Sequence, residues 1–343
     1  MEKLIINASS VSGGGAKKRL LKTVQYLSDE FDIIVIKQKN IEVTGVKIIN
    51  IPDKGIFFFR FIYDLLVPFI LRGFGYKKMY LLGSFYFGFF SGNVFWNITN
   101  IEPFRDFSKA GYDWKQTFRL KMLYFLFKVS KKPKVLISQS NYTKNLINSK
   151  FNGKYNIVTV SNGVSLQSKV SFSASRSKQA VFVGQMVRYK RIEMIIKQLN
   201  NTGFFTESKL LLIGQTDWDL DYYRELVELI QVLKLKDNVI ILGQLQPDKV
   251  LHYISHSDFM VYANEYDNCP NCVLESLSFG VPVLAWKNEV IVELAENGGI
   301  LIVNEVLKKE QVKEVCSLRD EFHFEYSWDS HFSKVVSIIR HEN

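Results

Sequence analysis

The chain has 343 residues, which is long for one hydrophobic core and natural for two domains of about 170 residues. A hydrophobic content of 47% argues against bulk disorder. The net charge of +10 is unevenly spread: residues 1–170 contain 26 Lys and Arg against 10 Asp and Glu, whereas residues 171–343 contain 18 against 24. A basic half of this size attracts either nucleic acid or the anionic cytoplasmic leaflet of a membrane.

The three cysteines, Cys269, Cys272 and Cys316, do not make a disulfide framework. With no secretory signal pattern at the N-terminus, we expect the reducing cytosol. Cys269 and Cys272 form a single CxxC motif. Because a zinc site needs a second ligand pair of matching spacing, we expect neither a metal site nor a redox site there.

The first element is a short buried strand, Leu4 to Ala8, followed by a glycine-rich loop and an amphipathic helix from about Ala16 to Leu27. The backbone of Gly14 and Gly15 in that loop can approach an anion or a sugar closely. A plain tight turn explains the glycines equally well.

Two long apolar stretches follow strands at 32–36 and 46–51. Residues 56–75 are interrupted by Arg60, Asp64, Pro68 and Arg72, which argues against a membrane span. Residues 79–98 have no charge but are punctuated by glycines, so we expect strand, short helix and strand rather than a transmembrane helix.

Residues 114–129 (WKQTFRLKMLYFLFKV) form a basic helix that is rich in aromatic residues. Such a helix can be a solvated face over a core, or it can lie on a membrane surface. The basic residues alternate with apolar aromatics and no nucleic-acid-binding motif is present, so we expect an anionic membrane surface as partner and no nucleic acid.

In the second half, a strand at 180–183 leads into a loop with two cations, Arg188 and Lys190, before a helix that begins near Arg191. Two cations on one loop suit an anionic ligand, although a basic surface loop is the simpler alternative. A second loop, after the strand at 210–213, carries Asp217-Trp-Asp219. We interpret these acids as caps of the helix at 221–233 rather than as metal ligands.

The stretch from Tyr262 to Ala285 contains the end of a strand, a loop with Asp267, a helix that opens near Asn271, and another buried strand. This order predicts a βαβ unit of a parallel sheet. The helix N-terminus offers free amides for a phosphate, and Glu275 on its second turn is placed to accept hydrogen bonds from ribose hydroxyls. The stretch therefore predicts a nucleotide site.

Asp267 and Glu275 stand eight positions apart, with PN-x-VLE between them and SFGVPVLA behind. This block resembles the E-x7-E block of retaining glycosyltransferases of the GT-B fold, family GT4. Further resemblances are Asn162-Gly-Val164, which ends the first domain in that family, and the FVGQMVRYK segment, whose family counterpart clamps the diphosphate. The resemblance implies an α/β protein of GT-B fold, in which two Rossmann-like domains with parallel sheets face across a cleft.

The resemblance also implies roles for individual residues. Lys190, with Arg188, would stabilise the leaving diphosphate, Asp267 would face the donor sugar, and Asn100, next to Thr99 at the position of the family's usual basic residue, would be a catalytic candidate. An Asx turn is the alternative for Asn100. The remaining donor-binding candidates are Glu275, Asn271, Val273, Leu274, Gln185, Gly14, Gly15 and Gln244, and no metal ligand or cofactor is expected.

Six serines between Ser165 and Ser177 indicate a linker. We therefore predict an acceptor-binding domain at 1–168, a nucleotide-sugar-binding domain at 169–325, and a terminal helix at 326–343 that crosses back to the first domain.

The predicted function is metal-independent, retaining transfer of a hexosyl group from a nucleotide sugar, with UDP or GDP as the nucleotide, to a glycan or lipid-linked acceptor in cell-surface polysaccharide synthesis such as O-antigen or capsule. The predicted location is cytoplasmic and peripheral on the inner face of the cell membrane. Two alternatives remain: a non-catalytic GT-B relative that acts as a membrane-associated binding subunit, and a nucleotide-sugar epimerase.

Overall fold

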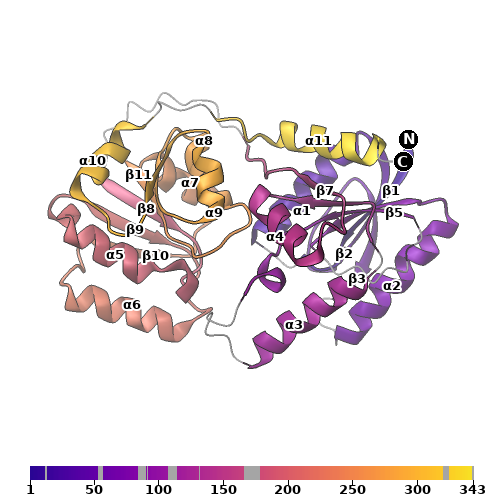
Figure 1. Cartoon of the computed structure of the whole chain (residues 1–343), viewed down its shortest axis with the longest axis horizontal. Coiled ribbons are helices and arrows are strands. Elements are labelled where there is room, and N and C mark those ends of the chain that lie inside the picture. The colour runs from indigo at the N-terminus through magenta and orange to yellow at the C-terminus, as the bar shows by residue number, and fades with distance from the viewer. Residues whose placement is uncertain are drawn as a thin grey trace. The chain divides into compact units, whose positions relative to one another are not determined.

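A computed structural model describes residues 1–11, 14–52, 57–83, 90, 92–106, 114–130, 132–165, 178–319 and 324–341. The chain divides into two compact units (Figure 1). Unit 1 comprises Met1–Asn162 together with Trp328–Asn343, and unit 2 comprises Gly163–Ser327.

Unit 1 is built on a seven-stranded parallel sheet with the order β3-β2-β1-β4-β5-β6-β7. Its strands are β1 (Glu2–Ala8), β2 (Phe31–Gln38), β3 (Lys47–Ile51), β4 (Lys78–Leu82), β5 (Asn93–Asn97), β6 (Val135–Ser138) and β7 (Ile157–Thr159). Side chains alternate between the two faces of the sheet, so Leu4 and Ile6 enter one hydrophobic cluster while Ile5 enters the other. Both faces are buried, which explains the continuous apolar runs of these strands.

Helices cover both faces of this sheet. α1 (Gly14–Leu27) and the terminal helix α11 (Trp328–His341) pack on one face, where Phe332 stacks on Tyr26 with ring centroids 4.8 Å apart. The buried Lys78 ammonium donates a 2.7 Å hydrogen bond to the Ile339 carbonyl near the end of α11. The other face is covered by α2 (Phe57–Gly73), α3 (Trp114–Val129) and α4 (Asn141–Phe151), with the short 3₁₀ helix η1 (Glu102–Phe104) beside them.

Unit 2 has a six-stranded parallel sheet with the order β10-β9-β8-β11-β12-β13. The strands are β8 (Gln179–Val183), β9 (Lys209–Ile213), β10 (Val239–Gly243), β11 (Phe259–Tyr262), β12 (Val283–Trp286) and β13 (Ile300–Val303). The connecting helices are α5 (Ile192–Asn201), α6 (Leu220–Val232), α7 (Pro247–Ser255), α8 (Asn271–Ser278), α9 (Glu289–Ala295) and α10 (Lys309–Ser317), with 3₁₀ turns η2 (Arg188–Lys190) and η3 (Phe204–Thr206).

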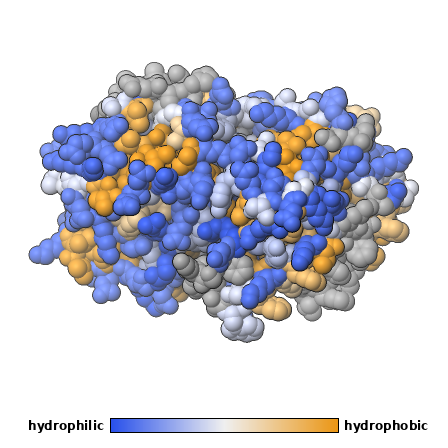
Figure 2. All heavy atoms as spheres, viewed as in Figure 1, coloured by the Kyte–Doolittle hydropathy of each residue, from blue (hydrophilic) through white to orange (hydrophobic). Residues whose placement is uncertain are grey.

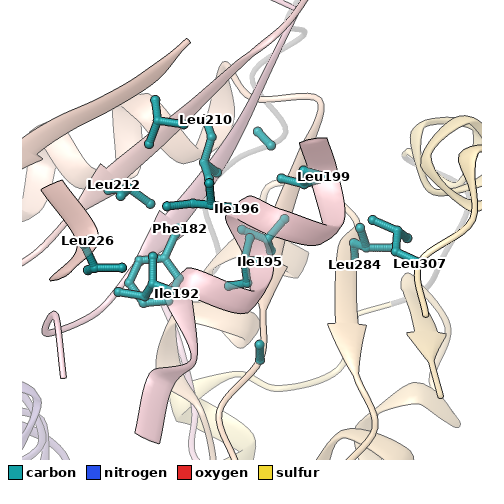
Figure 3. Close-up of a cluster of buried hydrophobic side chains, with 14 of the residues drawn as sticks. Phe182, Ile192, Ile195, Ile196, Leu199, Leu210, Leu212, Leu226, Leu284 and Leu307 are labelled. Atoms are coloured by element: carbon teal, nitrogen blue, oxygen red, sulfur yellow. The ribbon is translucent and has the colours of Figure 1, made fainter. Parts of the chain in front are cut away.

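The core of unit 2 shows why α5 lies where it does. Its apolar positions recur at helical spacing, so Ile192, Ile195, Ile196 and Leu199 share one buried side. Figure 3 shows these side chains directed at residues of the neighbouring strands and of α6, among them Phe182, Leu210, Leu212 and Leu226. This packing fixes the start of α5, and therefore the loop between β8 and α5, against the sheet.

The predicted fold class is confirmed: both units are Rossmann-like, with parallel sheets and helices on their faces. The segment at 56–75 forms α2, a helix with Pro68 inside it, and 79–98 contributes β4 and β5. The short helix predicted between those strands falls largely outside the described residues. Among the described helices, none is both long enough and apolar enough to cross a membrane.

Candidate functional site

The strand order of unit 2 places two loops together at one edge of the sheet. From β8 the chain continues through β9 and β10 on one side, and β11 then returns to pair with β8 on the other side. The carboxyl ends of β8 and β11 are therefore neighbours at the point where the strand order reverses. In open α/β sheets, ligands bind outside the carboxyl ends of strands at such a point.

The loop after β8 is pressed against the loop after β9. Gly184 and Met186 donate backbone hydrogen bonds of 2.9 Å each to Ile213 and Gln215. Gly214 has a φ of +151°, and a Cβ atom there would lie 1.8 Å from the Gly184 carbonyl oxygen. No side chain fits at this crossing, which holds the backbone of Gln185 at the sheet edge.

The two cations of this loop have different surroundings. Arg188 forms a bidentate ion pair with Glu225 of α6, at 2.9 and 2.7 Å, and its guanidinium lies 5.2 Å from the centre of the Tyr222 ring. Lys190 makes no ion pair or hydrogen bond with its side chain among the described residues, and its ammonium lies 5.2 Å from the centre of the Tyr189 ring. Lys190 therefore keeps its positive charge uncompensated by a paired carboxylate, whereas Arg188 is directed to α6.

Asp267 in the loop after β11 is held by three donors. The Tyr262 hydroxyl and the Asn264 amide each donate to Oδ2 at 3.0 Å, and the Asn268 backbone amide donates to Oδ1 at 2.8 Å. Burial, together with the nearby Asp267 carboxylate, raises the pKa of Tyr262 well above its ordinary value, so its proton stays available for this bond. The Oδ1 atom of Asn264 is buried and has no hydrogen-bond partner in the described structure.

The helix α8 opens directly behind this loop. Pro270 is its N-cap, and no side chain caps the helix. The amide of Leu274 already donates to the Pro270 carbonyl at 3.2 Å. Leu274, one of the donor-binding candidates, therefore uses its amide for the first hydrogen bond of the helix, whereas Asn271, Cys272 and Val273 precede that bond.

Cys272, in the first turn of α8, lies within electrostatic range of three predicted charges. Burial raises the pKa of its thiol to about 12, the charge of Lys190 lowers it, and the carboxylates of Asp267 and Glu275 raise it. All three charges therefore act within range of one thiol. The three residues come from the β8 loop, the β11 loop and α8, and the structure brings them together.

A second link joins the same loops. The rings of Tyr189 and Tyr266 are stacked, with centroids 5.0 Å apart and planes 18° apart. The Glu265 amide donates a 3.1 Å hydrogen bond to the Tyr189 carbonyl. Sequence reasoning missed both tyrosines; the available signal was an aromatic residue next to each charged candidate, Lys190 and Asp267.

Other candidates in unit 2 lie farther out or have structural roles. Gln244 is exposed after β10, two strands away from β8. Asp219 caps α6 by accepting a 3.0 Å hydrogen bond from the Tyr222 amide, as the cap interpretation predicted. None of the three cysteines forms a disulfide in the described structure. Within the described ranges, no group of three or more His, Cys, Asp or Glu side chains could hold a metal ion.

The unit 1 candidates can be described only within their own unit. Asn100 is exposed, and its Oδ1 atom accepts a 2.9 Å hydrogen bond from the Glu102 amide, which is the Asx turn that was the alternative to a catalytic role. Gly14 and Gly15 open α1, while Ser12 and Gly13 lie outside the described residues. Like β8 and β11, β1 and β4 are neighbours where the strand order reverses, so α1 begins at the equivalent place in this sheet.

Unit 1 also contains a buried polar chain that the sequence analysis did not identify. The Asn97 amide donates to the Tyr80 hydroxyl at 2.7 Å, Gln139 donates to Asn97 at 3.3 Å, and Asn162 donates to Gln139 at 3.4 Å. Arg19 of α1 completes the chain by donating to Asn162. These bonds join α1 to the ends of the strands, so Asn162 of the Asn-Gly-Val segment has a structural role.

Comparison with known proteins finds a family match in the second half of the chain. Residues 165–319 match the family model of glycosyl transferases group 1. An uncharacterized glycosyltransferase, MJ1059 of Methanocaldococcus jannaschii, is 30% identical over 105 residues, which are 30% of this chain and 24% of that protein. The matched segment thus spans about a quarter of its length.

Solved structures are similar over nearly the whole chain. Sucrose-phosphate synthase from Thermosynechococcus elongatus superimposes with a TM-score of 0.73 at 14% identity, covering 99% of both chains. WaaG, a glycosyltransferase involved in lipopolysaccharide biosynthesis, gives 0.73 at 14% identity, covering 98% of this chain and 99% of its own. Anabaena HepE in complex with UDP-glucose gives 0.64 at 14% identity, covering 99% and 95%. The chain therefore has the GT-B fold, and its residues 165–319 match the glycosyl transferases group 1 family.

Proposed function

We propose that this protein is a retaining glycosyltransferase that transfers a sugar from a nucleotide sugar to a glycan or lipid-linked acceptor in cell-surface polysaccharide synthesis. The observation that carries the proposal is the contact between the β8 loop, which carries Lys190, and the β11 loop, which carries Asp267, at the topological switch point of unit 2, directly before the helix α8 that carries Glu275. A cation, an uncapped helix N-terminus and two carboxylates match the diphosphate, ribose and sugar of such a donor.

In the proposed arrangement, Lys190 and the opening amides of α8 bind the diphosphate, Glu275 accepts hydrogen bonds from the ribose hydroxyls, and Asp267 accepts them from the donor sugar. The bond between the anomeric carbon and the diphosphate breaks while the acceptor hydroxyl attacks from the same side. A donor phosphate oxygen takes the hydroxyl proton. The chain then contributes orientation and electrostatic stabilisation of the leaving diphosphate, with neither a covalent intermediate nor a metal ion.

The nucleotide is proposed to be UDP, with GDP as the second candidate. HepE, whose fold this chain shares, has been solved with UDP-glucose, and this supports testing UDP first. We further propose that unit 1 binds the acceptor, while Gly14 and Gly15 keep the donor-binding role and Asn100 the catalytic role that the resemblance implies.

The test is a thermal-shift panel of UDP-, GDP-, ADP- and dTDP-sugars on the wild type, Glu275→Ala and the matched control Glu228→Ala, whose carboxylate is exposed on α6. We expect one donor class to raise the Tm of the wild type and of Glu228→Ala but not of Glu275→Ala. If no donor stabilises the wild type, the non-catalytic alternative replaces the proposal. Conversion of the donor sugar without any acceptor would instead identify an epimerase.

A second feature supports an anionic membrane surface as partner. On α3 the exposed side chains include Trp114, Phe118, Phe125 and Val129, with 74%, 64%, 59% and 59% of their surfaces accessible. On α2 and just after it, Leu66, Phe69, Ile70 and Phe74 are also exposed. Residues 114–156 contain ten Lys or Arg and no Asp or Glu.

Both helices pack on the same face of the unit 1 sheet, since each contributes to one hydrophobic cluster, so their exposed sides belong to one outer layer. Figure 2 shows hydrophobic residues among hydrophilic ones along the edge where Figure 1 places α2 and α3. Exposed aromatic residues combined with a positive charge of this density are typical of proteins that lie on anionic bilayers. We therefore propose peripheral attachment to the cytoplasmic face of the membrane.

Liposome co-sedimentation tests this attachment. We expect binding to vesicles that contain about a third phosphatidylglycerol, weaker binding to pure phosphatidylcholine, and loss of binding in Phe118→Ser/Phe125→Ser. The control is Trp218→Ser. The Trp218 side chain is about as exposed as those of Phe118 and Phe125, but it lies in unit 2. Binding to DNA or RNA instead of vesicles would contradict the proposal.

A further inference from the structure

Two tyrosines connect the β8 loop to the β11 loop. Tyr189 immediately precedes Lys190, and Tyr266 immediately precedes Asp267. Their stacked rings and the hydrogen bond from the Glu265 amide to the Tyr189 carbonyl join the loops at two points. Tyr266 is buried and Tyr189 is half-buried, and neither ring belongs to the main hydrophobic cluster of unit 2. The stack therefore lies beside that cluster, between the two loops of the site.

The face of Tyr189 also contacts Lys190, the cation of this loop that has no carboxylate partner among the described residues. The Lys190 ammonium lies 5.2 Å from the centre of that ring, within the distance at which a ring face attracts a cation. The adjacent cation, Arg188, is held by the Glu225 carboxylate instead. The turn therefore orients Arg188 through a carboxylate and Lys190 through an aromatic ring.

The two supports have different consequences for an anionic ligand. A carboxylate orients a cation but cancels its charge and repels a phosphate, so the ligand would have to displace it. An aromatic ring orients the ammonium through its quadrupole and leaves the net charge in place. A long lysine side chain otherwise loses considerable rotamer freedom when it binds a ligand, and prior orientation reduces that cost.

We propose that the Tyr189–Tyr266 stack is a positioning device that holds Lys190 ready for the diphosphate of the donor and ties this cation to the Asp267 loop. This inference rests on the proposed function, because it takes Lys190 as a diphosphate ligand. Tyr189 acts on the ammonium directly, and Tyr266 acts through Tyr189. Both are positioning residues, because neither has to touch the reacting atoms.

The test compares a charged ligand with its neutral counterpart. The diphosphate is whichever of UDP, GDP, ADP and dTDP the wild type binds most tightly by calorimetry, and the counterpart is the corresponding nucleoside. We expect Tyr189→Leu to weaken diphosphate binding by about three- to thirtyfold, the range of a cation–π contact, and to leave nucleoside binding unchanged. Tyr189→Phe keeps the ring face and should bind like the wild type.

A double-mutant cycle separates positioning from general damage to the loop. In the Lys190→Ala background, Tyr189→Leu should cause no further loss of diphosphate affinity. If Tyr189→Leu is too unstable for calorimetry, Tyr189→Met, which keeps the bulk without the ring, takes its place. Equal losses for diphosphate and nucleoside, or a full additional loss in the Lys190→Ala background, would overturn the inference and make the stack purely structural.

The role of Lys190 and the role of the two tyrosines can be refuted separately. If Lys190→Ala binds the diphosphate like the wild type, the proposed function of Lys190 is wrong. If Lys190→Ala loses affinity while Tyr189→Leu does not, the diphosphate role of Lys190 stands and the positioning role of the tyrosines is refuted.

Discussion

The Tyr262 hydroxyl donates a 3.0 Å hydrogen bond to the Asp267 carboxylate, and this bond connects the last residue of β11 to the loop that carries the acid. With the Asn264 and Asn268 donors, it fixes both oxygens of an acid that is half-buried. The orientation of Asp267 is therefore set by the protein before any ligand arrives, which favours a role that requires defined geometry.

Tyr262→Phe should test this support. Loss of one hydrogen bond to a charged acceptor is expected to cost about 1.5–3 kcal/mol of folding free energy in unit 2. Sugar transfer should fall as well, because Asp267 loses a constraint. Urea unfolding and kcat/KM are the measurements; Tyr262→Phe with unchanged stability and activity would show that the other two donors suffice.

Lys190→Ala should weaken binding of the preferred nucleoside diphosphate by about tenfold to a hundredfold, because a charge-assisted contact to phosphate is lost. Its Tm should stay close to that of the wild type, because among the described residues Lys190 makes no ion pair whose loss would destabilise the fold. The matched control is Lys197→Ala, a lysine exposed on α5. Equal affinity in both variants would remove Lys190 from the site.

Arg188 was predicted to assist Lys190, and its ion pair with Glu225 provides a way to examine this. Arg188→Ala should reduce diphosphate affinity less than Lys190→Ala does. Glu225→Gln should leave Tm nearly unchanged, because exposed ion pairs contribute little to stability. It should also leave diphosphate affinity equal or higher, since the guanidinium is released. A loss of affinity in Glu225→Gln would mean that the pair itself shapes the loop.

Gly214→Ala should be strongly destabilising, by at least about 2 kcal/mol, because the new Cβ would collide with the Gly184 carbonyl and the backbone φ is unfavourable for alanine. Gly203→Ala separates the two causes: Gly203 has a φ of +75°, but no described atom lies within 4 Å of the position that an alanine methyl group would take. Thermal unfolding should show a clearly smaller loss for Gly203→Ala. Equal losses of stability in the two variants would mean that the close approach of Gly214 to the Gly184 carbonyl adds nothing to the destabilisation.

His331 on α11 should make unit 1 sensitive to acid. Burial lowers the pKa of its imidazole to about 4. The hydrogen bond with the Ser161 carbonyl raises this pKa, whereas the charges of Arg19 and Lys334 lower it further. The unfolded chain, with an ordinary pKa near about 6.5, binds the proton first, so stability falls as the pH drops from about 6.5 to 4 and is constant above that range.

His331→Gln removes this titration. We expect the difference in unfolding free energy between pH 7.5 and pH 4.5 to shrink by about 2–3 kcal/mol. His341→Gln is the control, because His341 is exposed at the end of the same helix. If the pH profile of His331→Gln matches that of the wild type, other groups cause the acid sensitivity.

Local patterns in the sequence were sufficient to predict the strands, the loops and the main charged candidates. The βαβ order around Asp267 and Glu275 depends on residues close together in the chain, where apolar periodicity and helix ends are visible. The same holds for the loop of Lys190 and for the cap role of Asp219. The pairing of β8 with β11 was not visible, because these strands are separated by the 75 residues 184–258, which include two other strands.

The tertiary structure alone decided which of these groups meet. It paired Arg188 with Glu225, 37 residues away, stacked Tyr189 on Tyr266, and placed the Lys190, Asp267 and Glu275 charges around one thiol. It also joined Arg19 to Asn162 across 143 residues. A contact between distant segments depends on strand order and packing, which no local pattern records. The sequence therefore determined what the loops carry, and the order of the strands determined where those residues come together.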